Sequence, residues 1–334
     1  MLAIIWLSCQ LVAMATEESS SNPLSPDDAF SVLGDETRLD ILRTLGEATD
    51  PLSFSALYDA VDVDDSGQFN YHLDTVVGHF VRKTDEGYVL RPPGRRIVEA
   101  VLSGAVTETP TVDRTTIDQH CEYCGSPVEI QWQDGSVELY CTSCAGKFGQ
   151  TRGGGPEGSA SVDGYLGRLT LPPAGVRDRS PDEVARTAWT WTNLEVMAFA
   201  SGICPRCSAT VEYELSVCED HDTSEGLCPA CDRHHAVTVG VECTNCILKT
   251  GGAAVLALLS NTELLSFVTD HDRNPIAPDD IGSVNEAHED YDEEVLSTDP
   301  FEARFTLTVD GDSLTITVDE DLSVVEATRD IDTQ

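Results

Sequence analysis

The 334-residue chain carries 59 acidic residues against 20 basic ones, a formal net charge of −39, and 40% of its residues are hydrophobic. This length is typical of two or three domains, and the hydrophobic fraction is sufficient for buried cores, which excludes wholesale disorder. The acidic residues are spread along the chain and only three of the basic residues are lysines, a balance typical of proteins that work in molar salt. Salt at that level screens charges within about 3 Å. The charge of a local surface is therefore a better indicator of binding partners than the net charge of the chain.

Residues 1–24 are expected to form a leader outside the folded domains. The apolar run from Met1 to Ala13 is too short to cross a bilayer, and no basic residue precedes it. Met14 is an alternative start, and a signal or membrane anchor is the other interpretation. We expect a cytoplasmic protein with no membrane partner.

Residues 25–104 show a helical pattern that ends in a hairpin. Helices are expected after the capping residues Ser25, Asp35 and Ser53, the second of them ending at Gly46, and a fourth helix begins at Ser66. Residues 80–84 and 88–91 alternate as strands around a turn, and a last helix covers 93–102. Four helices, a hairpin and a closing helix predict a winged helix-turn-helix, with the fourth helix as the reading helix and the hairpin as the wing.

Two segments of this region carry a family resemblance. LGDETRLDIL at 33–42 and QFNYHLD at 68–74 resemble the ArsR-type family of winged-helix transcription regulators, in particular the haloarchaeal members with appended zinc ribbons. The resemblance covers about residues 27 to 104 and implies binding to double-stranded DNA as a homodimer. The cysteines of the metal-sensing members are missing from this region, so metal sensing there is not expected.

The candidate DNA contacts lie on the fourth helix and the hairpin. Between residues 66 and 96 the chain has five basic and three acidic residues, a local charge of +2. A helical projection points residues 71 and 75 outward with 68 and 70 on the flanks, whereas His72 lies nearer the apolar stripe and is expected to pack. Amide side chains can read adenine, and basic or hydroxyl groups can bind phosphate; an ordinary solvated hairpin is the alternative. The predicted contacts are Ser66, Gln68, Asn70, Tyr71, Thr75, Arg82, Lys83, Arg91, Arg95 and Arg96.

Ten of the 12 cysteines form five Cys-x-x-Cys pairs, and a Cys-x-x-His pair repeats the spacing. Two such knuckles close a tetrahedral Zn²⁺ site, so the pattern predicts three structural zinc ions. Disulfides and a redox Cys-x-x-Cys are the competing interpretations, which the recurrence and the histidine disfavour. In chain order the sites are Cys121, Cys124, Cys141 and Cys144; Cys204, Cys207, Cys218 and His221; Cys228, Cys231, Cys243 and Cys246. A cross-brace, in which Cys204 and Cys207 share a metal with Cys228 and Cys231, is the alternative pairing.

The knuckle spacing leaves room for one short hairpin per site, which predicts zinc ribbons. The expected fold class is α+β, a winged helix-turn-helix followed by small zinc-ribbon β modules and an α/β C-terminal segment. The expected plan after residue 104 is a first ribbon at 115–150, a linker at 151–179, a helix at 180–202, two ribbons at 203–250, and a helical pair, acidic loop and β-hairpin at 253–334.

No catalytic constellation is visible, since the sequence shows no Ser-His-Asp pattern, no phosphate-binding Gly-Lys loop and no open metal triad. A hydrolase in the acidic carboxyl half would rest on abundant carboxylates alone. The sequence therefore predicts a non-enzymatic, zinc-containing, sequence-specific DNA-binding regulator whose effector is unknown. The alternative is an adaptor that uses its zinc ribbons to bind the transcription machinery.

Overall fold

The computed structural model describes residues 24–149, 162–224, 227–277, 281 and 291–331. The chain divides into two compact units, one up to Val106 and one from Thr107 onward. We call them the helical unit and the cysteine-rich unit. The expected leader, apart from Leu24, lies outside the described residues, as does most of the acidic loop.

In the part of the helical unit that the structure describes there are five helices and one two-stranded antiparallel ribbon, in the expected order. The central helix α2 contacts the other four helices, and Ile41 and Leu42 on it are fully buried. The ribbon pairs Arg82 with Val89. The elements are α1 (Pro26–Leu33), α2 (Glu36–Glu47), α3 (Phe54–Ala60), α4 (Ser66–Val76), β1 (Val81–Lys83), β2 (Tyr88–Leu90) and α5 (Pro92–Leu102).

Local capping explains several of these boundaries. Ser25 and Ser53 accept hydrogen bonds from backbone N–H groups three residues on, as expected. Two expectations were wrong. Asp35 occupies the N-cap position of α2 without a side-chain cap bond, because its carboxylate faces His72 instead, and α2 continues through Gly46 to Glu47.

The cysteine-rich unit begins with a four-stranded antiparallel sheet in the order β3-β4-β5-β6. The strands are β3 (Val112–His120), β4 (Pro127–Gln133), β5 (Ser136–Cys141) and β6 (Tyr165–Thr170). Part of the expected linker is therefore a strand, since β6 pairs with β5 and places Arg168 opposite Glu138. The aliphatic and aromatic residues of β4 and β5 form a buried core against this sheet. The Trp132 indole N–H donates to the Leu171 carbonyl at 3.0 Å.

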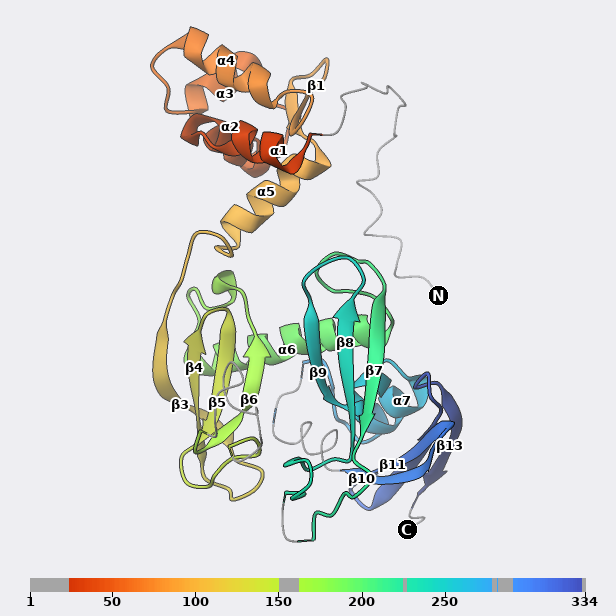
Figure 1. Cartoon of the computed structure of the whole chain (residues 1–334). Helices are drawn as coiled ribbons and strands as arrows, with labels where there is room; N and C mark the ends of the chain where they lie inside the picture. Colours follow the sequence, from red (N-terminus) through yellow and green to blue (C-terminus); the bar gives the residue numbers. More distant parts are fainter. Residues whose placement is uncertain (1–23, 150–161, 225–226, 278–280, 282–290, 332–334) are drawn as a thin grey trace. The chain divides into compact units, whose positions relative to one another are not determined.

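Helix α6 (Pro181–Ala200) joins this sheet to the rest of the unit. It starts with a capping box in which the Ser180 hydroxyl and the Glu183 carboxylate each accept from the other's backbone N–H. Ala188 on this helix packs into the core beside β3–β6, whereas Val196 belongs to the second core of the unit. The helix thus runs behind two sheets, as Figure 1 shows.

The second sheet is three-stranded, in the order β7-β8-β9, and the third is a four-stranded meander, β10-β11-β12-β13. The expected carboxyl hairpin is confirmed by the pairing of Leu307 with Leu314, but β10 and β13 extend it, and β10 occupies part of the expected acidic loop. The remaining elements are β7 (Val211–Val217), β8 (Val237–Cys243), β9 (Lys249–Ala253), β10 (Tyr291–Thr298), β11 (Phe301–Val309), β12 (Asp312–Val318), β13 (Val324–Asp330), the 3-10 helices η3 (Pro173–Gly175) and η4 (Ala254–Leu258), and α7 (Thr262–Asp270).

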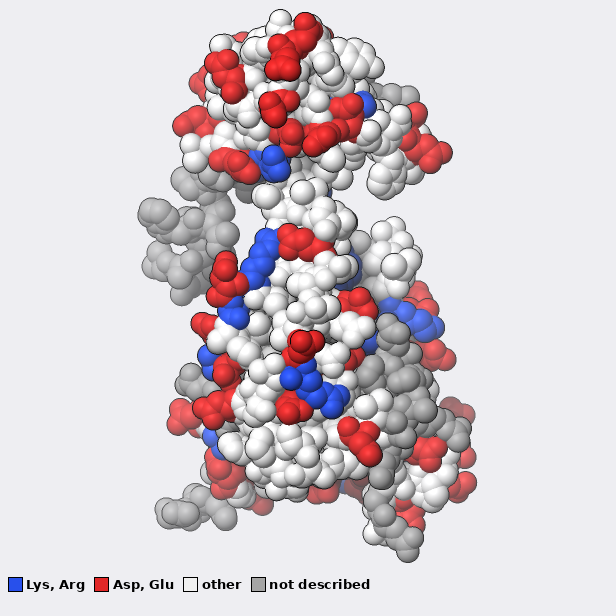
Figure 2. Space-filling view, turned by 90° about the vertical axis from the view of Figure 1, so that its left-hand side faces the viewer, with Lys and Arg blue, Asp and Glu red and all other residues white. Residues whose placement is uncertain are grey.

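The apolar face of β8 packs on the third sheet and α7 in one continuous core. Within the described residues, no helix is both long enough and apolar enough to cross a membrane. On the face drawn in Figure 2, aspartate and glutamate are scattered over the surface rather than gathered in one patch.

Candidate functional site

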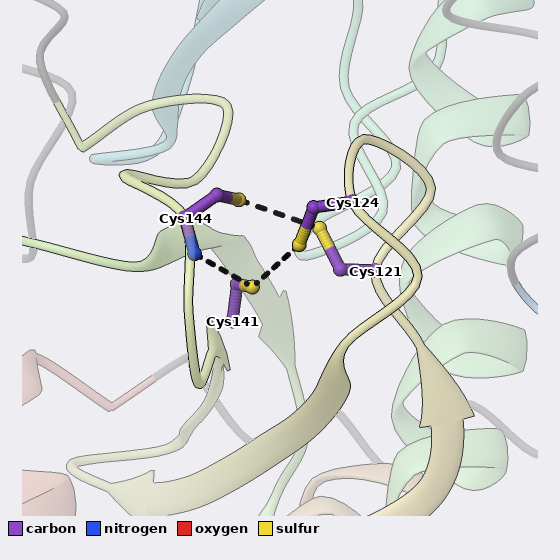
Figure 3. Close-up of side chains that lie close together, drawn as sticks. All are labelled: Cys121, Cys124, Cys141 and Cys144. Atoms are coloured by element: carbon purple, nitrogen blue, oxygen red, sulfur yellow. Dashed lines mark hydrogen bonds between the residues drawn. The ribbon is translucent and has the colours of Figure 1, made fainter.

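The first candidate metal centre is the one that the sequence predicts. Cys121 and Cys124 lie on the turn after β3, while Cys141 ends β5 and Cys144 follows it, and all four thiols converge (Figure 3). The sulfur atoms of Cys121 and Cys144 are 3.7 Å apart, and those of Cys124 and Cys141 are 3.4 Å apart. Backbone N–H groups of Ser143 and Cys144 donate to the Cys141 sulfur at 3.3 Å.

The other two centres correct the predicted pairing, because the knuckles are nested instead of sequential. One centre combines the first and last pairs of the segment 204–246, and the other combines the two pairs between them. The alternative cross-brace pairing is therefore also wrong. The groups are Cys204, Cys207, Cys243 and Cys246, and Cys218, His221, Cys228 and Cys231.

The register of β7 against β8 causes this nesting. Val211, just after the first knuckle, lies opposite Cys243, and Val217, just before the second, lies opposite Val237. The outer knuckles therefore meet at one end of the ladder and the inner ones at the other, about 20 Å away for six strand steps of roughly 3.4 Å. The sequence held a signal for this: the only long strand patterns here, 211–215 and 236–239, each needed a partner.

In every group the ligand atoms lie within 4.8 Å of one another. Tetrahedral zinc at about 2.3 Å from each sulfur separates two sulfurs by about 3.8 Å, close to the observed 3.4 to 3.7 Å. These separations exclude disulfides within the groups, and the eleven described cysteines are free thiols. The three groups are therefore compatible with three zinc ions.

Within each centre the surroundings lower the pKa of one thiol and raise the pKa of at least one other. Hydrogen bonds lower the pKa to about 6 for one thiol per centre: from Ser126 for Cys124, from the Asp222 backbone for Cys228, and from the Cys246 backbone for Cys243. Burial raises the pKa of the Cys121 thiol to about 12, so that thiol needs the metal to ionise.

The single histidine ligand is oriented by its second ring nitrogen. His221 Nδ1 lies 3.5 Å from the Cys231 sulfur, while its Nε2 lies 3.2 Å from the His234 carbonyl oxygen. An imidazole that donates from one nitrogen to a backbone carbonyl presents the other as a free lone pair, which is the usual arrangement at zinc.

The ten predicted DNA contacts lie on α4, β1, α5 and the residue before α5. Eight of them are exposed, including Tyr71 at 64%, and Thr75 and Arg91 are half-buried. Within the described residues, Arg82, Lys83 and Arg95 form no ion pair, whereas Arg96 pairs with Glu99 at 2.9 Å. The exposed faces of α4 and of the ribbon therefore present Gln68, Tyr71, Arg82 and Lys83 to solvent.

Several of the predicted contacts are already engaged within the unit. The Asp65 carboxylate, not Ser66, caps α4 by accepting from the Gln68 N–H at 2.7 Å, so an acid occupies the place expected for a phosphate. The Asn70 amide donates to Asp74 at 2.8 Å, and the Thr75 hydroxyl donates to a backbone carbonyl at 2.7 Å.

Arg91 and His72 also make contacts within the helical unit. The Arg91 guanidinium donates to the Gly78 carbonyl and ties the start of α5 to the turn after α4. His72 is 7% exposed with Nδ1 3.3 Å from a carboxylate oxygen of Asp35, so the prediction that it packs is confirmed.

Comparisons with known proteins match two family models. A domain of unknown function, DUF7351, matches residues 118–324, and a second one, DUF7347, matches residues 26–101. The first match covers more than half of the chain and includes all three candidate metal centres. No curated protein and no solved structure matches the chain.

Proposed function

The chain belongs to the DUF7351 domain family, and we propose that it is a cytoplasmic, sequence-specific DNA-binding regulator with three structural zinc sites. In this proposal the helical unit is a winged helix-turn-helix of ArsR type. Helix α4 reads the major groove, the β1–β2 ribbon is the wing, and two copies of the chain bind double-stranded DNA together.

One observation carries the proposal: the exposed face of α4 is followed directly by the basic stretch of the unit. Residues 27–65 contain eleven acidic and two basic residues, whereas residues 66–96 contain three acidic and five basic ones. The local charge thus changes from negative to positive over the elements with which a winged helix contacts DNA. A phosphate backbone requires such a local charge even when the whole chain is acidic.

The contacts divide between base reading and phosphate binding. Gln68 and Tyr71, exposed on α4, are the proposed base contacts, since an amide can pair with adenine and a phenol can donate or accept at a base edge. Arg82 and Lys83 are the proposed phosphate contacts on the ribbon. Asn70 would have to release Asp74 before it could read a base.

The proposed role of zinc is structural. Four protein ligands per centre leave no position for a substrate or an activated water, and short modules draw much of their folding free energy from the metal. The centres would fix the ends of β5, β7 and β8 and so hold the two sheets that flank α6.

The test is binding to the genomic DNA of the source organism in molar potassium chloride, with purified zinc-loaded protein. Gln68→Ala and Tyr71→Ala should each weaken binding to a selected fragment by about tenfold or more and relax its specificity. Arg82→Gln and Lys83→Gln should weaken all sequences alike and lower the salt slope by about one. Ser55→Ala, exposed on α3, and Arg43→Gln, exposed on α2, are the matched controls.

The dependence on salt supplies a second criterion. If only about four phosphates are neutralised, the logarithm of affinity falls with the logarithm of salt by a slope no steeper than about four. Binding in brine then rests on base-edge and apolar contacts. A steeper slope, or selected fragments bound equally by the Gln68→Ala protein, would contradict the proposed reading helix.

A second candidate function is a protein-binding adaptor of the transcription machinery. The observation that favours it is apolar exposure at the metal knuckles: Ile247, next to Cys246, is fully exposed, and Tyr123, between two ligands of the first centre, is 53% exposed. An adaptor would show no sequence preference in the same DNA assay. Ile247→Ser would then abolish capture of its protein partner while leaving the zinc content unchanged.

A further inference from the structure

Helix α4 is held in the helical unit by two kinds of contact. Its apolar stripe packs into the core, where Phe69, Leu73 and Val76 are fully buried. Apolar burial is non-directional, whereas the attraction between two charged or polar groups depends on the positions of two particular atoms. A polar contact from α4 to its neighbour α2 therefore restricts the rotation of the helix about its axis more sharply than the stripe alone does.

Such a contact exists as a cluster of three polar side chains between α2 and α4. The carboxylate oxygen Oδ1 of Asp35 lies 3.3 Å from Nδ1 of His72 and 3.9 Å from Nε of Arg38. All three atoms are shielded from solvent, and none makes a hydrogen bond of regular geometry with any described residue. Each is therefore compensated by the other members of the cluster.

This cluster tolerates little displacement of α4. The attraction between Asp35 and its two neighbours is stronger at a partly buried site than in water, and a carboxylate shielded from water without a partner is costly. A rotation of α4 that moved His72 away from Asp35 would incur that cost. The cluster therefore favours one rotation of α4, and this rotation determines where the exposed side chains of the helix point.

The same histidine also contacts a proposed base contact. The rings of His72 and Tyr71 meet edge to face, with centroids 5.3 Å apart and an interplanar angle of 72°. Tyr71 is 64% exposed, so the imidazole supports a side chain that is otherwise largely in solvent. Edge-to-face ring pairs attract one another beyond the area that they bury. A series of contacts thus runs from Asp35 on α2 through His72 to the Tyr71 ring.

We propose that His72 is a positioning residue of the reading helix. Its contact with Asp35 sets the rotation of α4, its contact with Tyr71 sets the direction of that ring, and together they determine which base edge the Tyr71 hydroxyl reaches. His72 is itself buried and is not a base contact. This inference rests on the proposed function, since it concerns how α4 reads DNA.

The test compares four variants of the full-length, zinc-loaded protein. His72→Leu removes the imidazole, and His72→Gln keeps a side-chain N–H that can donate to Asp35. Asp35→Ala removes the carboxylate without uncapping α2, because Asp35 makes no side-chain cap bond. Asp40→Ala is the matched control: Asp40 pairs with Arg43 on α2 at 2.9 Å, and its side chain is 30% exposed against 32% for Asp35.

The first measurement is the ratio of the affinities for a selected DNA fragment and for a scrambled one. Asp35→Ala and His72→Leu should each lower this ratio about tenfold and leave the affinity for the scrambled fragment within about twofold. His72→Gln should recover at least about threefold of that loss, and Asp40→Ala should match the wild type. A variant that is only partly folded loses both affinities alike, so a merely structural role would leave the ratio unchanged.

The double change Asp35→Ala with His72→Leu tests whether the two residues act through one contact. It should discriminate between the fragments no worse than His72→Leu alone, because either single change already breaks the contact. Two independent effects would instead multiply to about a hundredfold loss.

The second measurement needs no DNA. The ring resonances of Tyr71 are followed by NMR of the free protein with ¹³C-labelled tyrosine, and Tyr71→Phe assigns them. Asp35→Ala and His72→Leu should both move these resonances, whereas Asp40→Ala should not. A shift with His72→Leu alone would show that the cluster with Asp35 does not act on Tyr71, which overturns the proposal.

The outcomes separate this inference from the proposed function. A wild-type protein that discriminates between the fragments, together with an Asp35→Ala or His72→Leu protein that discriminates equally well, overturns the positioning role alone, as does a double variant with multiplied effects. A wild type that binds no fragment selectively overturns the proposed function and the positioning for base reading with it.

Discussion

The nested pairing of the metal ligands makes a prediction that separates it from every sequential arrangement. Cys207 and Cys243 have sulfur atoms 3.4 Å apart and belong to one centre, whereas Cys207 and Cys218 lie at opposite ends of the β7–β8 ladder, about 20 Å apart. The double change Cys207→Ser with Cys243→Ser should therefore remove one zinc ion and leave two. The double change Cys207→Ser with Cys218→Ser should remove two and leave one.

The stoichiometry is measured by elemental analysis and native mass spectrometry after dialysis against a weak chelator, with Ser208→Ala as a control next to a knuckle. Sequential pairing reverses the two outcomes, because there Cys207 and Cys218 would share a metal. Each lost centre also removes part of a binding free energy of about 10 to 16 kcal/mol, so a large fall in melting temperature should accompany every missing ion. A Cys207→Ser with Cys218→Ser protein that keeps two ions would refute the nested arrangement.

Three further predictions concern the folded state. Phe69→Ala should destabilise the helical unit by about 3 to 5 kcal/mol in urea unfolding, because Phe69 is fully buried and packs edge-on against Phe54 at 5.2 Å; a loss below 1 kcal/mol would place Phe69 outside the core. Ser180→Ala removes the cap of α6 and should cost about 1 kcal/mol in the same assay. His235 stacks on Tyr291, and burial lowers its pKa to about 4. The folded chain therefore binds a proton at His235 less readily than the unfolded chain does. The stability contributed by the neutral ring is full above about pH 6.5 and is lost as the pH falls toward 4. His235→Phe keeps the stack and removes the titrating group. When the pH is lowered from 7.5 to 5.5 at equal zinc content, its free energy of unfolding should therefore rise by about 1 kcal/mol relative to that of the wild type. A difference that does not change with pH would show that His235 is not buried as a neutral ring.

Features set by neighbouring residues could be predicted from the sequence. The caps at Ser25, Ser53 and Ser180 and the helices they start depend on hydrogen bonds spanning three residues. The burial of His72 follows from its angle on α4. The first metal centre was predictable for the same reason, since its two knuckles enclose the single hairpin β4–β5.

Features set by contacts between distant segments could not be read from the chain in order. Asp35 and Asp65 have the same capping chemistry, but only Asp65 caps, because Asp35 faces a histidine that lies 37 positions away. The strand β6 lies in a stretch whose composition indicated a linker, and it is a strand because β5 offers it a free edge.

By itself the sequence determined which residues gather into candidate metal centres, how many centres they form and where most helices begin, because a knuckle or a cap is complete within a few residues. The tertiary structure alone decided which knuckles come together in one centre. A Cys-x-x-Cys turn supplies only half of a tetrahedral site, and the register of β7 on β8 selects its partner.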